Sequence, residues 1–153
     1  MNVGIVGLGL IGGSMAKSIK ARTGHTVFGI ARSEETLMMA RMCGAIDAPL
    51  TQENLSQCDL ILIAIRPAAA IEWVRRNAAD ISKSAVVVDL CGVKRVVVES
   101  IAPIAEQYGF AYIGGHPRAA QADPPAHHHR PQPRHRQELA GGAPGSGRRG
   151  HRL

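Results

Sequence analysis

A glycine-rich turn near the start of the chain constrains the fold more than any other feature. The motif GLGLIG at residues 7–12 follows the apolar stretch 3–6 and precedes residues 14–19, which contain neither glycine nor proline. The apolar stretch is typical of a buried strand, and the glycines mark a turn into a helix. We therefore expect the chain to begin with a strand, a tight turn and a helix.

The three glycines of this motif have the spacing of a phosphate-binding turn. Gly7 allows the turn, Gly9 lets the backbone approach a ligand without a Cβ, and Gly12 lets the helix pack close to the strand. The free amides of the first helical turn, which include those of Leu10 and Ile11, and the positive end of the helix dipole then face the ligand. This arrangement predicts binding of a pyrophosphate, as in dinucleotide cofactors.

Two other interpretations of the same residues are weaker. A plain connecting turn does not need three glycines, each of which weakens the first helical turn by about 1 kcal/mol. The sequence GGSMA at residues 12–16 resembles the nucleophile elbow of serine hydrolases, but Ser14 would lie one turn inside the helix instead of on the turn itself.

Strand and helix patterns alternate along the chain as far as residue 113. Apolar runs predict strands over residues 2–6, 26–31, 59–65, 85–90 and 110–113. The segments between them predict helices ending near residue 22, over 34–43 and 67–79, and after residue 94, where Pro103 predicts a kink or a late start. This alternation implies right-handed crossovers, and therefore an α/β fold with a doubly wound, mostly parallel, Rossmann-like sheet.

Ligands of such sheets bind at the carboxyl ends of the strands. Besides the glycine turn, the candidate cofactor-binding residues at these ends are Arg32, Ser33, Ile65, Arg66 and Cys91.

The residues at the end of the second strand indicate the type of cofactor. An NAD-binding domain usually has Asp or Glu there, roughly twenty residues past the glycine turn, to bind the ribose 2′-hydroxyl. This chain has Arg32 and Ser33, which suit a 2′-phosphate through charge-assisted hydrogen bonds. NADP is the expected cofactor and NAD the alternative, since an exposed arginine also occurs beside helix caps or stacks on adenine.

Composition divides the chain at about residue 117. Residues 1–117 contain 11 Lys and Arg against 10 Asp and Glu, whereas residues 118–153 contain seven arginines against two acids. The second segment has only two large apolar side chains, Leu139 and Leu153, too few to offset the entropy of ordering it. We expect a dinucleotide-binding domain over residues 1–117 and a disordered Arg-, His-, Pro- and Gly-rich tail over 118–153.

Several classes of location and partner are disfavoured by composition. Three cysteines without a CxxC pair suit a reducing compartment, so a cytoplasmic location is expected. Five glycines interrupt the apolar stretch 3–15, which argues against a signal peptide or a membrane span. Residues His127–His129 in the tail would bind metal only adventitiously, and the tail has no aromatic side chain to stack on bases. Neither a working metal site nor a specific nucleic-acid role is expected.

Three blocks of the sequence resemble the signature motifs of prephenate and arogenate dehydrogenases, the oxidoreductases of tyrosine biosynthesis. They are VGIVGLGLIGGS at residues 3–14, DLCGVK at 89–94 and GGHP at 114–117. The resemblance implies oxidative decarboxylation of prephenate or arogenate. Hydride passes from the ring carbon that bears the hydroxyl to the nicotinamide, carbon dioxide leaves, and the ring becomes aromatic. It also implies that His116 hydrogen-bonds the substrate hydroxyl and assists its loss of a proton, a role that suits an imidazole.

The chain departs from the family pattern in two places. Gly92 stands where many relatives have a serine that assists at the substrate hydroxyl, and Lys94 matches the family lysine, although a lysine that opens a helix is commonly just solvated. After GGHP the sequence does not continue into the family's mostly helical second domain, which supplies a substrate-binding arginine and the dimer interface. We expect a truncated form with impaired activity.

The abrupt change at Arg118 suggests that the tail arose from a reading-frame shift or is a gene remnant. Sequencing the source DNA tests this hypothesis, because a shifted frame near codon 118 should encode a helical, apolar-periodic continuation. Loss of the second domain also predicts exposed apolar surface near the last strand, and hence self-association. Two functions remain: a dehydrogenase of the prephenate or arogenate type, and a non-catalytic module that binds NAD(P).

Overall fold

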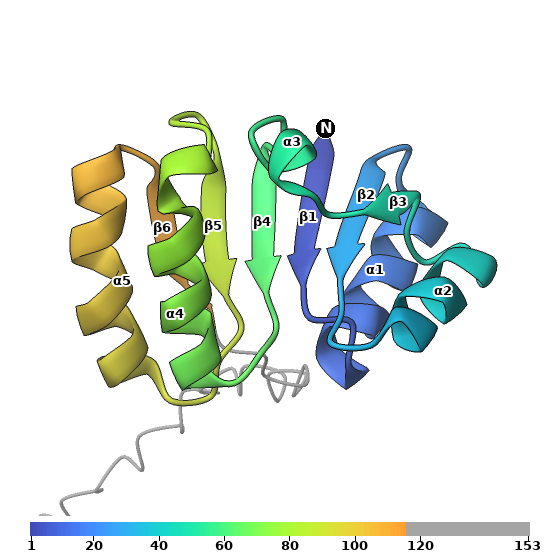
Figure 1. Cartoon of the computed structure of the whole chain (residues 1–153), viewed down its shortest axis with the longest axis horizontal. Coiled ribbons are helices and arrows are strands. Elements are labelled where there is room, and N and C mark those ends of the chain that lie inside the picture. The colour runs from blue at the N-terminus through green and yellow to red at the C-terminus, as the bar shows by residue number, and fades with distance from the viewer. Residues whose placement is uncertain (116–153) are drawn as a thin grey trace, which may run out of the picture. The chain divides into compact units, whose positions relative to one another are not determined.

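The apolar runs of the sequence form parallel strands in the computed structural model, which describes residues 1–115. The described sheet has six strands: β1 (Asn2–Val6), β2 (Thr26–Ile30), β3 (Ala48–Pro49), β4 (Leu60–Ile63), β5 (Val86–Asp89) and β6 (Ala111–Gly114). Their order is β3-β2-β1-β4-β5-β6, and each neighbouring pair is parallel (Figure 1). The order reverses between β1 and β4, which is the switch point where doubly wound sheets bind ligands. The predicted fold class is confirmed.

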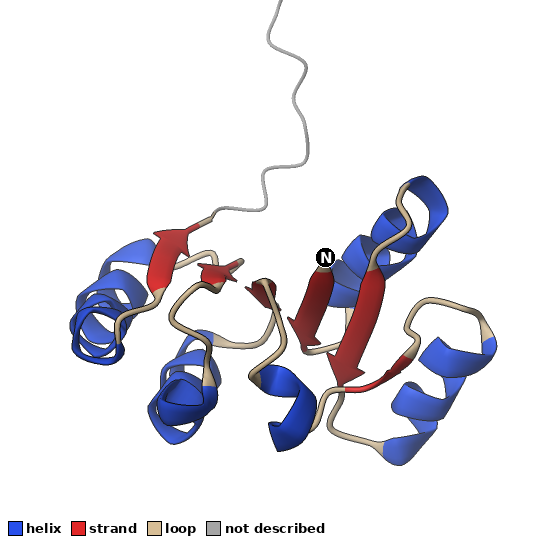
Figure 2. Ribbon diagram, turned by 90° about the horizontal axis from the view of Figure 1, so that it is seen from above, coloured by secondary structure: helices blue, strands red, loops and turns tan. Residues whose placement is uncertain are grey.

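The connecting segments lie on both faces of the sheet (Figure 2). They form α1 (Leu10–Arg22), α2 (Glu34–Met42), α3 (Gln52–Leu55), α4 (Pro67–Asn77), the 3-10 turn η1 (Ala78–Asp80) and α5 (Lys94–Tyr108). Buried side chains of α1 and the apolar side of α2 pack on one face, and those of α3, α4 and α5 pack on the other. The sequence pattern does not predict β3 or α3, which span two and four residues.

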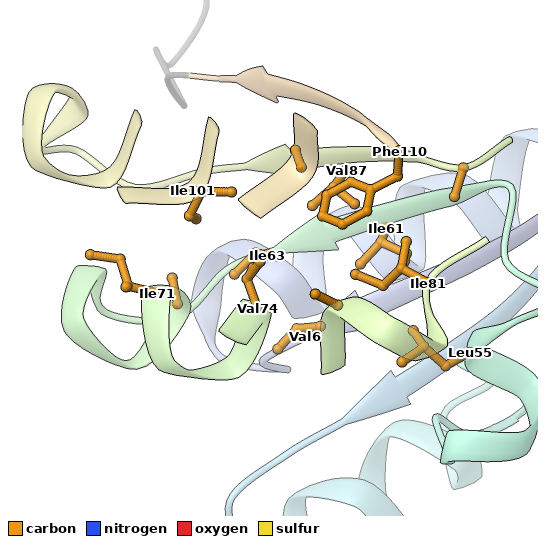
Figure 3. Packing of buried hydrophobic residues seen from close by; sticks show 14 of the residues in the cluster. Val6, Leu55, Ile61, Ile63, Ile71, Val74, Ile81, Val87, Ile101 and Phe110 are labelled. Atoms are coloured by element: carbon orange, nitrogen blue, oxygen red, sulfur yellow. The ribbon is translucent and has the colours of Figure 1, made fainter. Parts of the chain in front are cut away.

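Neighbouring residues of β1, β2, β4 and β5 belong to two different hydrophobic clusters. On the α4 and α5 face, Ile61, Ile63 and Val87 are fully buried with Ile101 (Figure 3). On the α1 and α2 face, Val3, Ile5 and Val27 form the second cluster. Side chains alternate between the two faces of a strand, so burial of both faces requires apolar residues at consecutive positions. This explains the uninterrupted apolar runs in the sequence.

The sheet is covered unevenly near β6. On the face that carries α1, Val88 is half-buried, and its register partner Ile113 is 55% exposed. Ala111, which pairs with Val86 on the same face, is exposed as well. The exposed apolar surface expected near the last strand is therefore present in the described part of the chain.

Helix α5 is continuous from Lys94 to Tyr108 with Pro103 inside it, so the late start considered above is wrong. Pro103 is exposed, and the helix ends at Gly109, whose φ of +85° is the left-handed conformation that favours glycine. None of the helices within residues 1–115 combines the length and the hydropathy needed to cross a membrane.

Candidate functional site

The glycine turn between β1 and α1 closes tightly against the sheet. Gly7 has a φ of +98°, and its amide donates to the carbonyl oxygen of Ile30 at 2.9 Å. A Cβ on Gly7 would lie 2.7 Å from the carbonyl oxygen of Ala64, and a Cβ on Gly12 would lie 1.8 Å from the carbonyl oxygen of Gly7. Contact therefore confines both positions to glycine.

Gly9 faces open space instead. It is the N-cap of α1 and lines a cleft, and a Cβ built on it would meet no heavy atom within 4 Å. The start of this 13-residue helix has no side-chain cap and no acidic residue in its first turn. Its first amides and the positive end of its dipole are thus available to an anion in the cleft. A diphosphate group fits this set of donors.

The cleft has a volume of about 680 Å³ and lies at the carboxyl ends of β1, β2, β4 and β5. Its lining is mostly apolar and comprises Val6, Gly7, Leu8, Gly9, Ile11, Ile30, Ala31, Arg32, Thr36, Ala64, Ile65, Arg66, Pro67, Ala69, Trp73, Leu90, Cys91 and Gly92. This volume is in the usual range for small-molecule sites, roughly 300–1,000 Å³. The structure thus has a cleft at the strand ends, where the sequence predicts ligand binding.

Among the described residues that line the cleft, Arg32 and Arg66 are the charged ones. Arg32 follows β2, and Arg66 follows β4 as the N-cap of α4. Within residues 1–115 neither arginine forms a salt bridge with a carboxylate. Two exposed guanidinium groups without a facing acid give the cleft a positive potential, which favours phosphate groups.

The structure brings most of the predicted cofactor-binding residues together. Seven of them line the cleft: Gly7, Gly9, Ile11, Arg32, Ile65, Arg66 and Cys91. The other three lie beside it. The side chain of Leu10 is 89% exposed, Gly12 is buried under the turn, and Ser33 caps α2 by accepting a hydrogen bond from the Thr36 amide at 3.2 Å.

Sequence reasoning missed two side chains of the cleft wall. Thr36 follows the Ser33 cap, and its hydroxyl lies 2.9 Å from the Ser33 hydroxyl. Trp73 lies one turn after Ala69 on α4, and both residues line the cleft. Residues four apart lie on the same side of a helix, but the sequence does not show that this side of α4 faces the cleft.

A buried carboxylate lies beside the β5 end of the cleft, next to the lining residue Leu90. Asp89, at the end of β5, is 0% exposed, and its side chain accepts hydrogen bonds from the Cys91 amide at 3.0 Å and the Tyr112 hydroxyl at 2.6 Å. The ammonium group of Lys94 forms an ion pair with the same carboxylate. We call Asp89, Lys94 and Tyr112 the carboxylate network. Lys94 is therefore bound to a buried acid and is not simply solvated.

Burial keeps the two weak acids beside this carboxylate protonated. The pKa of the Cys91 thiol is raised by burial and by the charge of Asp89, with Lys94 opposing the shift. The thiol donates to the carbonyl oxygen of Ile65 at 3.4 Å. Burial also raises the pKa of Tyr112, and its hydrogen bond to Asp89 raises it further. Both groups act as hydrogen-bond donors at neutral pH.

His116, the predicted catalytic residue, and the histidines of the tail lie outside the described residues. The last described residue is Gly115, whose amide donates to the carbonyl oxygen of Asp89 at 2.9 Å. No cluster of three or more potential metal ligands (His, Cys, Asp or Glu) occurs in the part of the chain that the structure describes.

Comparison with known proteins gives consistent matches. The sequence profile of the family described as prephenate dehydrogenase, nucleotide-binding domain, matches residues 15–124, past the domain boundary expected at residue 117. The prephenate dehydrogenase of Lactococcus lactis is 31% identical over 119 residues, which are 75% of this chain and 33% of that protein.

Two solved structures share the fold at comparable identity. The prephenate dehydrogenase of A. aeolicus, in complex with hydroxyphenyl propionate and NAD+, is 27% identical with a TM-score of 0.68 over 78% of this chain and 42% of that one. The arogenate dehydrogenase of Synechocystis is 31% identical with a TM-score of 0.68 over 80% of this chain and 42% of that one. The chain thus spans less than half the length of these relatives. It belongs to the family of prephenate dehydrogenase nucleotide-binding domains.

Proposed function

We propose that the chain binds NADP+ in the cleft and is the cofactor-binding part of a dehydrogenase that acts on prephenate or arogenate. The observation that carries the proposal is the open start of α1, where Gly9 leaves backbone amides facing the cleft. The A. aeolicus relative, solved with NAD+ and hydroxyphenyl propionate, supports binding of a dinucleotide and of an aromatic acid, whereas the choice of NADP+ rests on Arg32.

The positions of β2 and β5 on opposite sides of β1 and β4 define how the cofactor would lie in the cleft. With the diphosphate at Gly9, the adenosine ribose lies toward the end of β2, because that is where this fold binds the 2′ position. Arg32 and Thr36 line this side of the cleft. The nicotinamide then lies toward the opposite side, which is lined by Cys91 and Gly92 after β5.

The charges on the adenosine side favour a 2′-phosphate. Arg32 stands where an NAD-binding domain usually has an acid, and no described residue that lines the cleft is acidic. A guanidinium group forms charge-assisted, bidentate hydrogen bonds with phosphate. NADP+ is therefore the proposed cofactor, in preference to NAD+.

The proposed reaction is oxidative decarboxylation of a cyclohexadienyl acid. The bound nicotinamide supplies the hydride acceptor. His116 is the proposed general base, which takes the proton of the substrate hydroxyl while carbon dioxide leaves and the ring becomes aromatic. A non-catalytic NAD(P)-binding module is the second candidate, because the glycine turn and the cleft account for cofactor binding without any catalytic group.

Calorimetric titration of the purified chain with NADP+ and NAD+ in parallel tests the cofactor proposal. We expect tighter binding of NADP+, and we expect Arg32→Asp to weaken NADP+ binding by about tenfold or more while sparing NAD+. Arg75→Asp is the matched control, since Arg75 lies on α4 in its last turn and does not line the cleft. Absence of heat with both dinucleotides would refute the proposal.

Assays of prephenate and arogenate oxidation with NADP+ separate the two candidates. A dehydrogenase turns over at least one of these substrates, and His116→Asn keeps NADP+ affinity while it loses turnover. NADP+ binding without turnover of either substrate would favour the non-catalytic module.

A further inference from the structure

The carboxylate network at the end of β5 has no part in holding the diphosphate, yet it buries a full charge. An ionised carboxylate is costly to bury unless donors satisfy it. Both side-chain oxygens of Asp89 have such donors: Oδ1 accepts from the Cys91 amide and from Lys94, and Oδ2 accepts from the Tyr112 hydroxyl. The site is therefore fully formed in the described structure.

The donors of this network come from three separate elements. The Cys91 amide belongs to the loop that lines the cleft after β5, Lys94 opens α5, and Tyr112 lies on β6. The main-chain carbonyl of Asp89 also accepts from the Gly115 amide at the end of β6. Asp89 thus joins the cleft-lining loop to the strand that leads toward the GGHP block.

Stability alone gives no reason for a charge at this position. Replacing a buried ion pair by apolar residues of similar volume is often neutral or stabilising. The neighbouring strand residues Val87 and Val88 show that apolar side chains pack well in β5. The charge instead lies where β5 meets the cleft, one residue from Leu90, which lines it.

We infer that Asp89, with Lys94 and Tyr112, is a positioning residue for the nicotinamide half of the cofactor. By fixing the Cys91 amide and the end of β6, it sets the shape of the surface formed by residues 90–92, on which the nicotinamide ring rests. This inference rests on the proposed function, because it requires a dinucleotide in the cleft. The inferred role concerns the geometry at the end of β5. It does not change the proposed binding of the diphosphate by the glycine turn.

The fluorescence of NADPH tests this inference without any need for turnover. Emission of the reduced nicotinamide rises when the ring is held in a shielded environment, whereas calorimetry reports binding of the whole cofactor. We expect the wild type to bind NADPH with enhanced emission. Asp89→Asn and Tyr112→Phe should lose most of this enhancement while the Kd for NADPH changes by less than about tenfold.

Asp59→Asn is the matched control. Asp59 also accepts a main-chain hydrogen bond, from the Asn2 amide at 2.7 Å, but it precedes β4 at the end of the sheet opposite the cleft. This variant should keep both the affinity and the emission of the wild type. Tyr112→Phe removes one hydroxyl and keeps the ring, so it provides the test if Asp89→Asn does not fold. Thermal unfolding shows whether each of the two variants is folded.

The outcomes separate this inference from the proposed function. A wild type that binds no NADPH by calorimetry refutes the proposed function, and the inference with it. Binding without enhanced emission in the wild type, or full enhancement in a folded Tyr112→Phe variant, overturns the inference alone.

Discussion

Gly9 and Gly12 lie one helical turn apart and respond differently to the same added methyl group. Gly9→Ala places a Cβ in open space and should cost on the order of 1 kcal/mol of stability at most, through the weaker N-cap preference of alanine. The Cβ enters the space proposed for the diphosphate, so dinucleotide affinity should fall by about tenfold or more. Calorimetric titration together with urea unfolding measures both effects.

Gly12→Ala is the contrasting variant. Its Cβ would lie 1.8 Å from the carbonyl oxygen of Gly7, so α1 must move away from the turn. We expect a loss of several kcal/mol in the free energy of unfolding, in the range of severe core substitutions, about 4 kcal/mol or more. Equal stability of the two alanine variants would contradict the described geometry.

Cys58 makes stability depend on alkaline pH. Burial and, to a lesser extent, the charge of Asp59 raise the pKa of this thiol from 9.0 to about 11. Because the folded-state pKa is above the unfolded value, the contribution to stability is complete below pH 9 and is lost as the pH rises toward 11. Unfolding in urea across this range should show a steeper fall for the wild type than for Cys58→Ala. Parallel slopes would contradict the prediction.

Single residues show where sequence reasoning succeeds and where it stops. The roles of Gly7 and Gly12 follow from chain-local geometry, so spacing alone predicts them. The contact between Tyr112 and Asp89 joins residues 23 positions apart on neighbouring strands. Nothing in the local pattern indicates which side chain reaches Asp89, because strand order and register decide it.

Helix α5 carries a defect that can be removed. Pro103 lies inside the helix and is exposed, so it gives up one backbone hydrogen bond without contributing to the core. Pro103→Ala should raise the free energy of unfolding, by up to about 3 kcal/mol on helix propensity and less after the greater entropy of the unfolded chain is included. Thermal and chemical unfolding measure the change. A lower melting temperature would show that the ring supports the helix.

Hydrophobic periodicity predicted the longer helices and strands, but it did not predict the short elements β3 and α3. Helix α2 begins at Glu34, where it was predicted to start, with Ser33 as its cap and two acids in its first turn. Strand β3 has two residues, one of them proline, and is too short to show an alternating pattern. It is defined by its pairing with β2, which only the folded sheet reveals.

For the described domain as a whole, the exposed apolar side chains of β6 predict association. Ile113 is 55% exposed next to Val88 and Ala111, and such surface favours contact between copies. Sedimentation should show concentration-dependent association of the wild type. Ile113→Thr keeps a β-branched residue but removes apolar surface, and should reduce this association. A monomeric wild type at high concentration would contradict the prediction.

The family was predictable because short blocks of the sequence resemble its signature motifs. The cleft was predictable because ligands bind at the switch point of such sheets. The sequence did not predict that Thr36 and Trp73 line the cleft. They do so because α2 and α4 begin close to the carboxyl ends of β2 and β4. Helix orientation relative to the sheet is a tertiary property, so their participation required the structure.

The two edges of the sheet differ in what can be added to them. The β3 edge is two residues long and includes Pro49, which lacks an amide hydrogen, so it offers little to a further strand. The β6 edge has four residues without a charge or a proline. Of the two edges, β6 is therefore the one at which a further strand would find a row of backbone hydrogen-bond partners.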